Sequence, residues 1–333
     1  MGRGPCGRVR SVRAGHESER HVRDRTVGRR RFLAWAAGLA AGGVAAGCSA
    51  PAAAPGPQAT PPLRLPAPEI WPPAEPAPQI TPENTPTTIT ELVYSEFRQA
   101  SVGLTVTYPS GVTNTENLPM VLSLHGRDGP VPTATPFGTL AAMESEYQAG
   151  TIPAFGFVSV DGGYNAYWNN GSLNGELMSM IQDEIPRWLL ERGLGEAGTG
   201  LPYACVGLST GGFGAACYAI ERNRRGIPLE AVGLLAPALM TDWKEVEVRQ
   251  AFPSEQVWRS HDPLLRLDEL GDVPVAVWIG DKDHFFDGTM QLVAGHENTP
   301  VVTILPGAHD GSVFDATGLE AVHFLSRDKP VEG

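Results

Sequence analysis

Gly207-Leu208-Ser209-Thr210-Gly211 lies between a short apolar run, residues 202–206, and a run of small residues, 211–219. This pattern predicts a strand that turns sharply into a helix, with glycines on both sides that keep the turn free of clashes. Such a turn would project the Ser209 hydroxyl out of the protein body at a helix N-terminus, where a base can reach it.

Strand-like and helical segments alternate on both sides of this turn. Apolar runs bounded by Gly, Pro or polar loops predict strands at 91–97, 103–108, 120–124, 155–160, 203–207, 231–235, 273–279 and 301–305. Helical spacing predicts helices at 138–149 and 176–188, and Pro186 predicts a kink or a new first turn in the second. Together these segments predict an α/β fold, with a mainly parallel sheet and helices on both faces.

Candidate reactive residues follow the strands. In a mainly parallel sheet, ligand sites lie at the carboxyl ends of the strands. Ser209 would need a base, because a serine hydroxyl is a weak nucleophile, and His309 follows the last predicted strand. Among the other histidines beyond the N-terminal segment, we expect His125 to shape a loop. We expect three to be solvated: His261, His284 and His296.

A carboxylate should orient the imidazole and stabilise its cation. The sequence Gly280-Asp281-Lys282-Asp283 follows the next-to-last strand. Asp283 is preferred, because three residues after Gly280 leave room for the chain to turn toward the His309 loop. Asp281, nearer the strand, is the alternative and could instead bond backbone amides. Asp287 and Asp310 are further alternatives.

An oxyanion hole needs two backbone N–H groups aimed at the developing negative charge. The N–H of Thr210 at the helix N-terminus is one candidate. The other would come from the loop after strand 120–124, with Arg127 as first choice and Gly126 as the alternative.

The order Ser209, Asp283, His309, with Leu124-His125-Gly126 after an early strand, resembles the α/β-hydrolase superfamily. Further similarity to the esterase D-like branch, which includes secreted mycolyltransferases, lies in four segments: Asp161-Gly162-Gly163-Tyr164, Trp168-Asn169-Asn170, helix 176–188 and Gly307-Ala308-His309-Asp310. The resemblance covers residues 92–328. One departure is the acid, since mycolate-transferring members can use Glu where this chain offers Asp.

The resemblance implies a serine esterase that forms an acyl-enzyme intermediate and uses no cofactor or metal. Two alternatives stay open. An acyltransferase acting on cell-envelope sugar or glycolipid acceptors would use the same residues. A non-enzymatic surface-binding protein could share the fold, although Ser209, Asp283 and His309 are all present, which argues against a decayed site.

Two segments could shape a substrate pocket. Tyr164, Trp168 and Asn169 lie in a loop after a strand end, and Trp168 could alternatively pack over the sheet edge. The insertion 240–272 contains Trp243 and Trp258, as well as Phe252. It could form a small lid above Ser209, or its aromatic side chains could form a small core of their own.

The N-terminus predicts export. Residues 1–47 combine a basic lead, Arg29-Arg30-Arg31 and an apolar run, 32–47, that falls short of the about 20 residues of a spanning helix. This pattern resembles a twin-arginine signal, and Ala45-Ala46-Gly47-Cys48 resembles a lipobox that would place a lipid on Cys48. An ordinary signal peptide is the alternative. Residues 48–87 are predicted to form an extended tether, because Pro, Ala and Thr dominate positions 51–86. Residues 88–333 are predicted to form the catalytic domain.

Charge and cysteine content limit the other function classes. Ten Arg and three acidic residues give residues 1–47 a net charge of +7, so the rest of the chain carries −19 within a total of −12. A body this acidic excludes electrostatic binding of nucleic acid. For the oligomeric state, a monomer is the default expectation. Cys205 and Cys217 are predicted to be buried free thiols, with a disulfide as the alternative.

Overall fold

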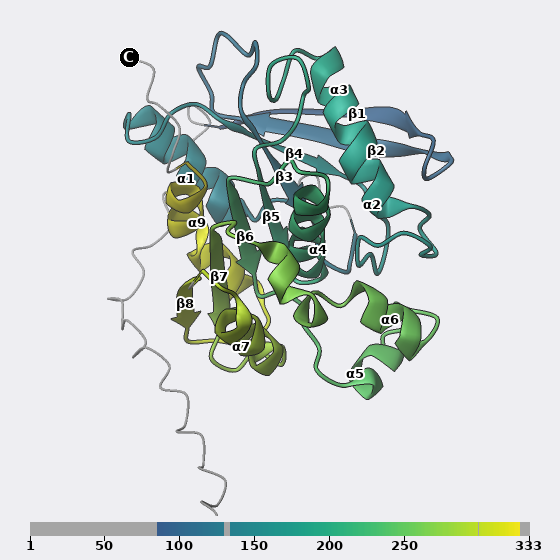
Figure 1. Ribbon diagram of the computed structural model, residues 1–333. Helices are drawn as coiled ribbons and strands as arrows, with labels where there is room; N and C mark the ends of the chain where they lie inside the picture. Colours follow the sequence, from purple (N-terminus) through teal and green to yellow (C-terminus); the bar gives the residue numbers. More distant parts are fainter. Residues whose placement is uncertain (1–84, 130–133, 299, 327–333) are drawn as a thin grey trace, which may run out of the picture. The chain divides into compact units, whose positions relative to one another are not determined.

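One mixed sheet organises the part of the chain that the computed structural model describes, residues 85–129, 134–298 and 300–326 (Figure 1). Its strand order is β1-β2-β4-β3-β5-β6-β7-β8. β1 and β2 pair antiparallel, β2 pairs antiparallel with β4, and β4 through β8 in this order are parallel. The strands are β1 Thr87–Ser95, β2 Ala100–Tyr108, β3 Met120–Leu124, β4 Gly156–Val160, β5 Ala204–Leu208, β6 Ala231–Leu235, β7 Val275–Gly280 and β8 Val301–Leu305.

The central strands are buried throughout and mostly apolar, because helices cover both faces of the sheet. Successive side chains point to opposite faces, so Leu122 and Cys205 pack under one helical layer and Val121 and Val206 under the other. The first layer contains α2 Leu177–Ser179, α3 Ile185–Glu191 and α4 Thr210–Arg224, and the second α1 Phe137–Gln148 and α9 Gly318–Ser326 (Figure 1). The predicted α/β-hydrolase architecture is confirmed.

The predicted helix 176–188 is interrupted. A π-helix, Met180–Glu184, separates α2 from α3. Pro186 has no N–H with which to bond the carbonyl of Gln182, so it cannot continue a regular helix. The wider turn appears just before it, where the N–H of Ile185 donates to the carbonyl of Met180.

The insertion after β6 is helical and packs on the main core. It contains α5 Trp243–Glu247, α6 Glu255–His261 and two 3₁₀ turns, Pro263–Leu265 and Leu267–Leu270. Trp243 and Trp258 lie with ring centroids 6.2 Å apart, and Phe252 packs on Tyr167 with centroids 5.4 Å apart. Phe252 and Trp258 belong to the main hydrophobic core and Trp243 packs against it, so the expectation of a separate small core is wrong. The remaining helices are α7 Phe286–Gly295 and α8 Gly311–Ala316.

Two predictions about side-chain burial have different outcomes. Cys205 and Cys217 are buried free thiols, as expected, and burial raises the pKa of Cys217 to about 12. His296 and His261 are not solvated as expected. His296 is buried after α7, where its Nδ1 accepts from the N–H of Asn298 at 3.0 Å, and half-buried His261 donates to the carbonyl of Val257.

The predicted signal segment, Cys48 and nearly all of the predicted tether lie outside the described residues. β1 begins at Thr87, the last residue assigned to that tether. Within the described ranges, every helix is too short or too polar to span a lipid bilayer.

Candidate active site

The turn at Ser209 is a left-handed backbone turn between β5 and α4. Ser209 has φ 55° and ψ −116° and precedes the first residue of the helix. A Cβ at Gly207 would collide with the carbonyl of Gly211, and a Cβ at Gly211 would collide with the carbonyl of Leu124. Glycine is required at both positions because the clashing atoms belong to the backbone. The sequence pattern therefore corresponds to a real steric demand.

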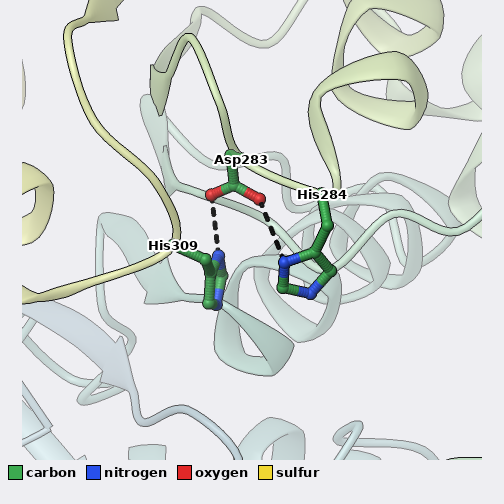
Figure 2. Close-up of side chains that lie close together, drawn as sticks. All are labelled: Asp283, His284 and His309. Atoms are coloured by element: carbon green, nitrogen blue, oxygen red, sulfur yellow. Dashed lines mark hydrogen bonds and ion pairs between the residues drawn. The ribbon is translucent and has the colours of Figure 1, made fainter.

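Ser209, His309 and Asp283 form a continuous chain of hydrogen bonds. His309 Nε2 lies 2.8 Å from Ser209 Oγ, and its Nδ1 lies 2.7 Å from Asp283 Oδ2. Figure 2 shows the carboxylate of Asp283 facing the imidazole of His309. Since the carboxylate accepts, Nδ1 carries the proton and Nε2 is left to accept the serine proton. These residues come from the ends of β5, β7 and β8, at the carboxyl edge of the sheet.

Asp283 is fixed on both of its oxygens. Its side chain has no solvent exposure, and Oδ1 accepts from the N–H of Phe285 at 2.8 Å while Oδ2 faces His309. Asp281 instead accepts from the N–H of Gly307 at 2.9 Å, and so holds the loop that carries His309. Asp310 caps α8 through Ser312, and Asp287 lies in the first turn of α7. Of the four acids considered, the carboxylate that bonds His309 is that of Asp283.

Aromatic rings hold the imidazole of His309 in place. Phe285 and Phe314 both meet it edge-to-face, with centroids 5.1 and 5.2 Å away. The His309 side chain is 18% exposed, so it is reachable from solvent while its orientation is restricted. Packing of this kind keeps a base aligned with its nucleophile.

His284 is exposed, as expected, but sequence reasoning missed that it lies beside Asp283 and His309. Its Nδ1 lies 3.9 Å from Asp283 Oδ1, and its ring centroid lies 5.0 Å from that of His309 (Figure 2). Burial and the neighbouring His309 lower the pKa of His284. Its adjacency to Asp283 in the sequence was the signal that could have identified it. Asp283, His284 and His309 also have the residue types and spacing of a metal site, with ligand atoms within 4.8 Å. Within this group, Asp283 Oδ2 and His309 Nδ1 already bond each other.

The two segments expected to form an oxyanion hole both adjoin Ser209. A Cβ on Gly126 would lie 3.4 Å from the Cβ of Ser209, which places the loop after β3 directly against the serine. Thr210 is the first residue of α4, where backbone N–H groups have no acceptor within the helix. The backbone of Arg127 is held by the loop after β4, because its carbonyl accepts from the N–H of Asn165 at 2.7 Å.

The structure separates the three candidate pocket residues. Trp168 is fully buried against α4, where Gly214 has no side chain to obstruct the ring, and its Nε1 donates to the carbonyl of His125. Asn169 is also buried and donates to the carbonyl of Asn170. Trp168 and Asn169 therefore belong to the core rather than to an open pocket, whereas Tyr164 is 62% exposed.

His125 shapes its loop, as expected. Its Nδ1 donates to the carbonyl of Gly126 at 2.7 Å, and its Nε2 accepts from the N–H of Gly162 at 2.8 Å. Burial lowers the pKa of His125, which agrees with a neutral ring that both donates and accepts. The imidazole thus links the loops that follow β3 and β4.

Solved structures with this fold are numerous, and three similar ones share less than a fifth of their residues with this chain. A ferulic acid esterase is 19% identical with a TM-score of 0.59, covering 73% of this chain and 98% of its own. An S-formylglutathione hydrolase from Agrobacterium tumefaciens is 15% identical with a TM-score of 0.55, covering 73% and 95%. A fluorophosphonate-binding serine hydrolase, FphF from Staphylococcus aureus, is 16% identical with a TM-score of 0.52, covering 73% and 99%. No curated protein sequence matches the chain.

These distant structures show the fold of the chain, and a family model shows the family to which it belongs. The family described as "Putative esterase" matches residues 95–303, which is more than half of the chain and includes Ser209 and Asp283. With this match and the α/β-hydrolase architecture, the chain belongs to the esterase family and is a carboxylic ester hydrolase.

Proposed function

We propose that this protein hydrolyses carboxylic esters with Ser209 as nucleophile, His309 as general base and Asp283 as the group that orients the imidazole. The observation that carries the proposal is the unbroken hydrogen-bond chain, 2.8 Å from Ser209 to His309 and 2.7 Å from His309 to Asp283. Each residue has the protonation pattern that its role requires, because buried Asp283 holds the proton on Nδ1 and leaves Nε2 free to accept.

In the first half of the reaction, Ser209 Oγ attacks the ester carbonyl carbon while its proton passes to His309 Nε2. The imidazolium that forms is stabilised by Asp283. The carbonyl oxygen becomes negatively charged, and the N–H of Thr210 with that of Arg127 or Gly126 would donate to it. Collapse of this intermediate breaks the bond to the alcohol, which leaves with the proton from His309, and an acyl-enzyme remains.

The second half repeats these steps with water. His309 Nε2 takes a proton from the water as its oxygen attacks the acyl carbon, and the negative charge again develops on the carbonyl oxygen. Collapse breaks the bond to Ser209, which regains its proton from His309. The products are a carboxylic acid and the free enzyme.

A fluorophosphonate probe tests the assignment, because it phosphonylates serines that are activated by a neighbouring base. One structural relative is itself described as fluorophosphonate-binding. We expect one adduct per chain, located on Ser209 by peptide mapping, with loss of ester hydrolysis in proportion to labelling. Denatured protein should not be labelled. An adduct on another residue, or full activity after complete labelling, would contradict the assignment.

We also propose that the enzyme is exported and anchored to the outer face of a membrane through lipid on Cys48. The support is sequence alone, the basic and apolar segment 1–47 followed by Cys48. Intact-mass analysis of protein from the membrane fraction should give a mature chain that begins at Cys48 and carries acyl chains. A Cys48→Ala variant should be absent from that fraction. An unmodified mature chain that begins elsewhere would refute the anchor.

A further inference from the structure

Two arginines at the edge of the site have no carboxylate partner among the described residues. The guanidinium of exposed Arg127 lies 5.5 Å from the centroid of the Tyr164 ring. That of half-buried Arg249 lies 5.1 Å from the centroid of the Phe285 ring. Most other described arginines form ion pairs with acidic side chains: Arg187, Arg192, Arg224, Arg225, Arg259 and Arg266. In so acidic a chain, two cations left unpaired at one place point to a ligand.

Asn165 holds the two arginine-bearing segments together. Its backbone N–H donates to the carbonyl of Arg127 at 2.7 Å, and its side-chain Nδ2 donates to the carbonyl of Arg249 at 2.8 Å. Asn165 itself has φ 56°, a left-handed conformation that is uncommon outside glycine. One residue therefore joins the loop after β3 to the insertion after β6, which are far apart in the sequence.

Each arginine is close to one of the reacting groups. Arg127 follows Gly126, whose backbone lies directly against Ser209. The guanidinium of Arg249 lies over the ring of Phe285. The Phe285 ring in turn contacts the imidazole of His309, with ring centroids 5.1 Å apart. The backbone of Arg127 thus adjoins the serine, and the Arg249 guanidinium lies one aromatic ring away from the histidine.

Buried polar atoms without hydrogen bonds lie beside the same pair. The Tyr167 hydroxyl and the Asn165 Oδ1 are both buried and have no hydrogen-bond partner within the described residues. Burial raises the pKa of Tyr167 to about 12, and the positive charges of Arg249 and Arg127 oppose that rise, so both charges act at its hydroxyl. The nearest acids in sequence, Asp128 and Glu247, form no ion pair with either arginine. The Arg249 guanidinium donates to the backbone carbonyl of Glu245, which carries no charge.

We propose that Arg127 and Arg249 select esters that carry a carboxylate, or a comparable anion, in their acyl or alcohol part. The inference rests on the proposed function, since it concerns the substrate of the same site. Guanidinium groups bind carboxylates through paired, charge-assisted hydrogen bonds, and the aromatic faces of Tyr164 and Phe285 orient both groups before the substrate arrives.

Chain-matched esters test this preference. For the acyl part, the 4-nitrophenyl monoester of adipic acid is compared with 4-nitrophenyl hexanoate. For the alcohol part, 4-acetoxybenzoate is compared with 4-acetoxybenzamide. We expect the wild-type kcat/KM to be higher for the anionic member of at least one pair, and the pair that shows it identifies the side that bears the charge. Added salt should reduce this preference, because ions screen exposed charges.

Variants assign the preference to the two side chains. Arg127→Gln and Arg249→Gln should each lower the ratio of anionic to neutral kcat/KM by about tenfold, the effect of losing one charge-assisted hydrogen bond. The ratio is the informative quantity, because the neutral ester reports any disturbance of the backbone near Ser209. Arg259→Gln is the matched control. Its side chain belongs to the same insertion but pairs with Glu255, so the ratio should stay at the wild-type value.

The outcomes separate the two proposals. Equal ratios for wild type and both variants on both substrate pairs would refute anion selection, while hydrolysis of the neutral esters through Ser209 would leave the proposed function intact. Hydrolysis that survives removal of the Ser209 hydroxyl would refute the proposed function itself.

Discussion

Ser209→Ala should lower kcat/KM for a neutral aryl ester by about 10⁶-fold, the loss typical of removing the nucleophile of a serine hydrolase. The expected cause is specific. Ser209 Oγ has a hydrogen bond to His309 and no other within the described residues, so its removal deletes the nucleophile without breaking a structural contact. The remaining rate would come from substrate binding and oxyanion stabilisation.

Steady-state kinetics on purified protein measure this loss, and a thermal unfolding curve shows whether the fold persists. Alanine should tolerate the left-handed backbone about as well as serine, because both carry a Cβ. Ser312→Ala is the control. It removes an exposed hydroxyl from α8, three residues beyond His309, and should keep wild-type activity. A Ser209→Ala enzyme within tenfold of wild type would assign the nucleophile elsewhere.

The sequence predicted the architecture and placed at one edge of the sheet three residues that the structure joins by hydrogen bonds, Ser209, His309 and Asp283. It could do so because the steric rules are local. Gly207 and Gly211 must lack side chains for β5 to turn into α4, and that demand is visible in five consecutive residues. The carboxyl ends of parallel strands share one edge, so a serine, an acid and a histidine that follow three such strands can meet.

Residues whose environment comes from distant segments were predicted less well. Trp168 looked like a pocket residue, but Gly214 on α4 lets its ring pack into the core. His296 looked solvated, and its burial depends on how α7 ends against the rest of the fold. The bridge made by Asn165 depends on the conformation of the insertion after β6. None of these environments leaves a periodic signal in the sequence, because each depends on tertiary packing.

The choice between Asp281 and Asp283 shows most clearly what sequence spacing alone cannot decide. Both follow β7, and spacing alone could only favour the second. The structure gives them different hydrogen bonds: Asp283 holds the imidazole, and Asp281 holds the backbone of the loop that carries it. The loop after β7 therefore supplies one carboxylate that holds the imidazole of His309 and another that holds the backbone of the neighbouring loop.

Asp283→Asn should lower kcat/KM by about 10⁴-fold through a change of tautomer. Asp283 Oδ1 accepts from the N–H of Phe285, and an asparagine would keep its one oxygen there. Its NH₂ group would then face His309 and donate to Nδ1. The imidazole proton would move to Nε2, so the ring could no longer accept the proton of Ser209. The geometry would survive while the base is lost.

Asp281→Asn is the matched comparison, because it makes the same chemical change two residues away. The Asp281 side chain is exposed, so an asparagine can keep its oxygen on the N–H of Gly307 and turn its NH₂ group to water. We expect kcat/KM to stay within about threefold of wild type, since one neutral hydrogen bond replaces one charge-assisted bond at an exposed site. Equal losses in the two variants would mean that the acids support the loop in the same way. A larger loss in Asp281→Asn would transfer the orienting role to that residue.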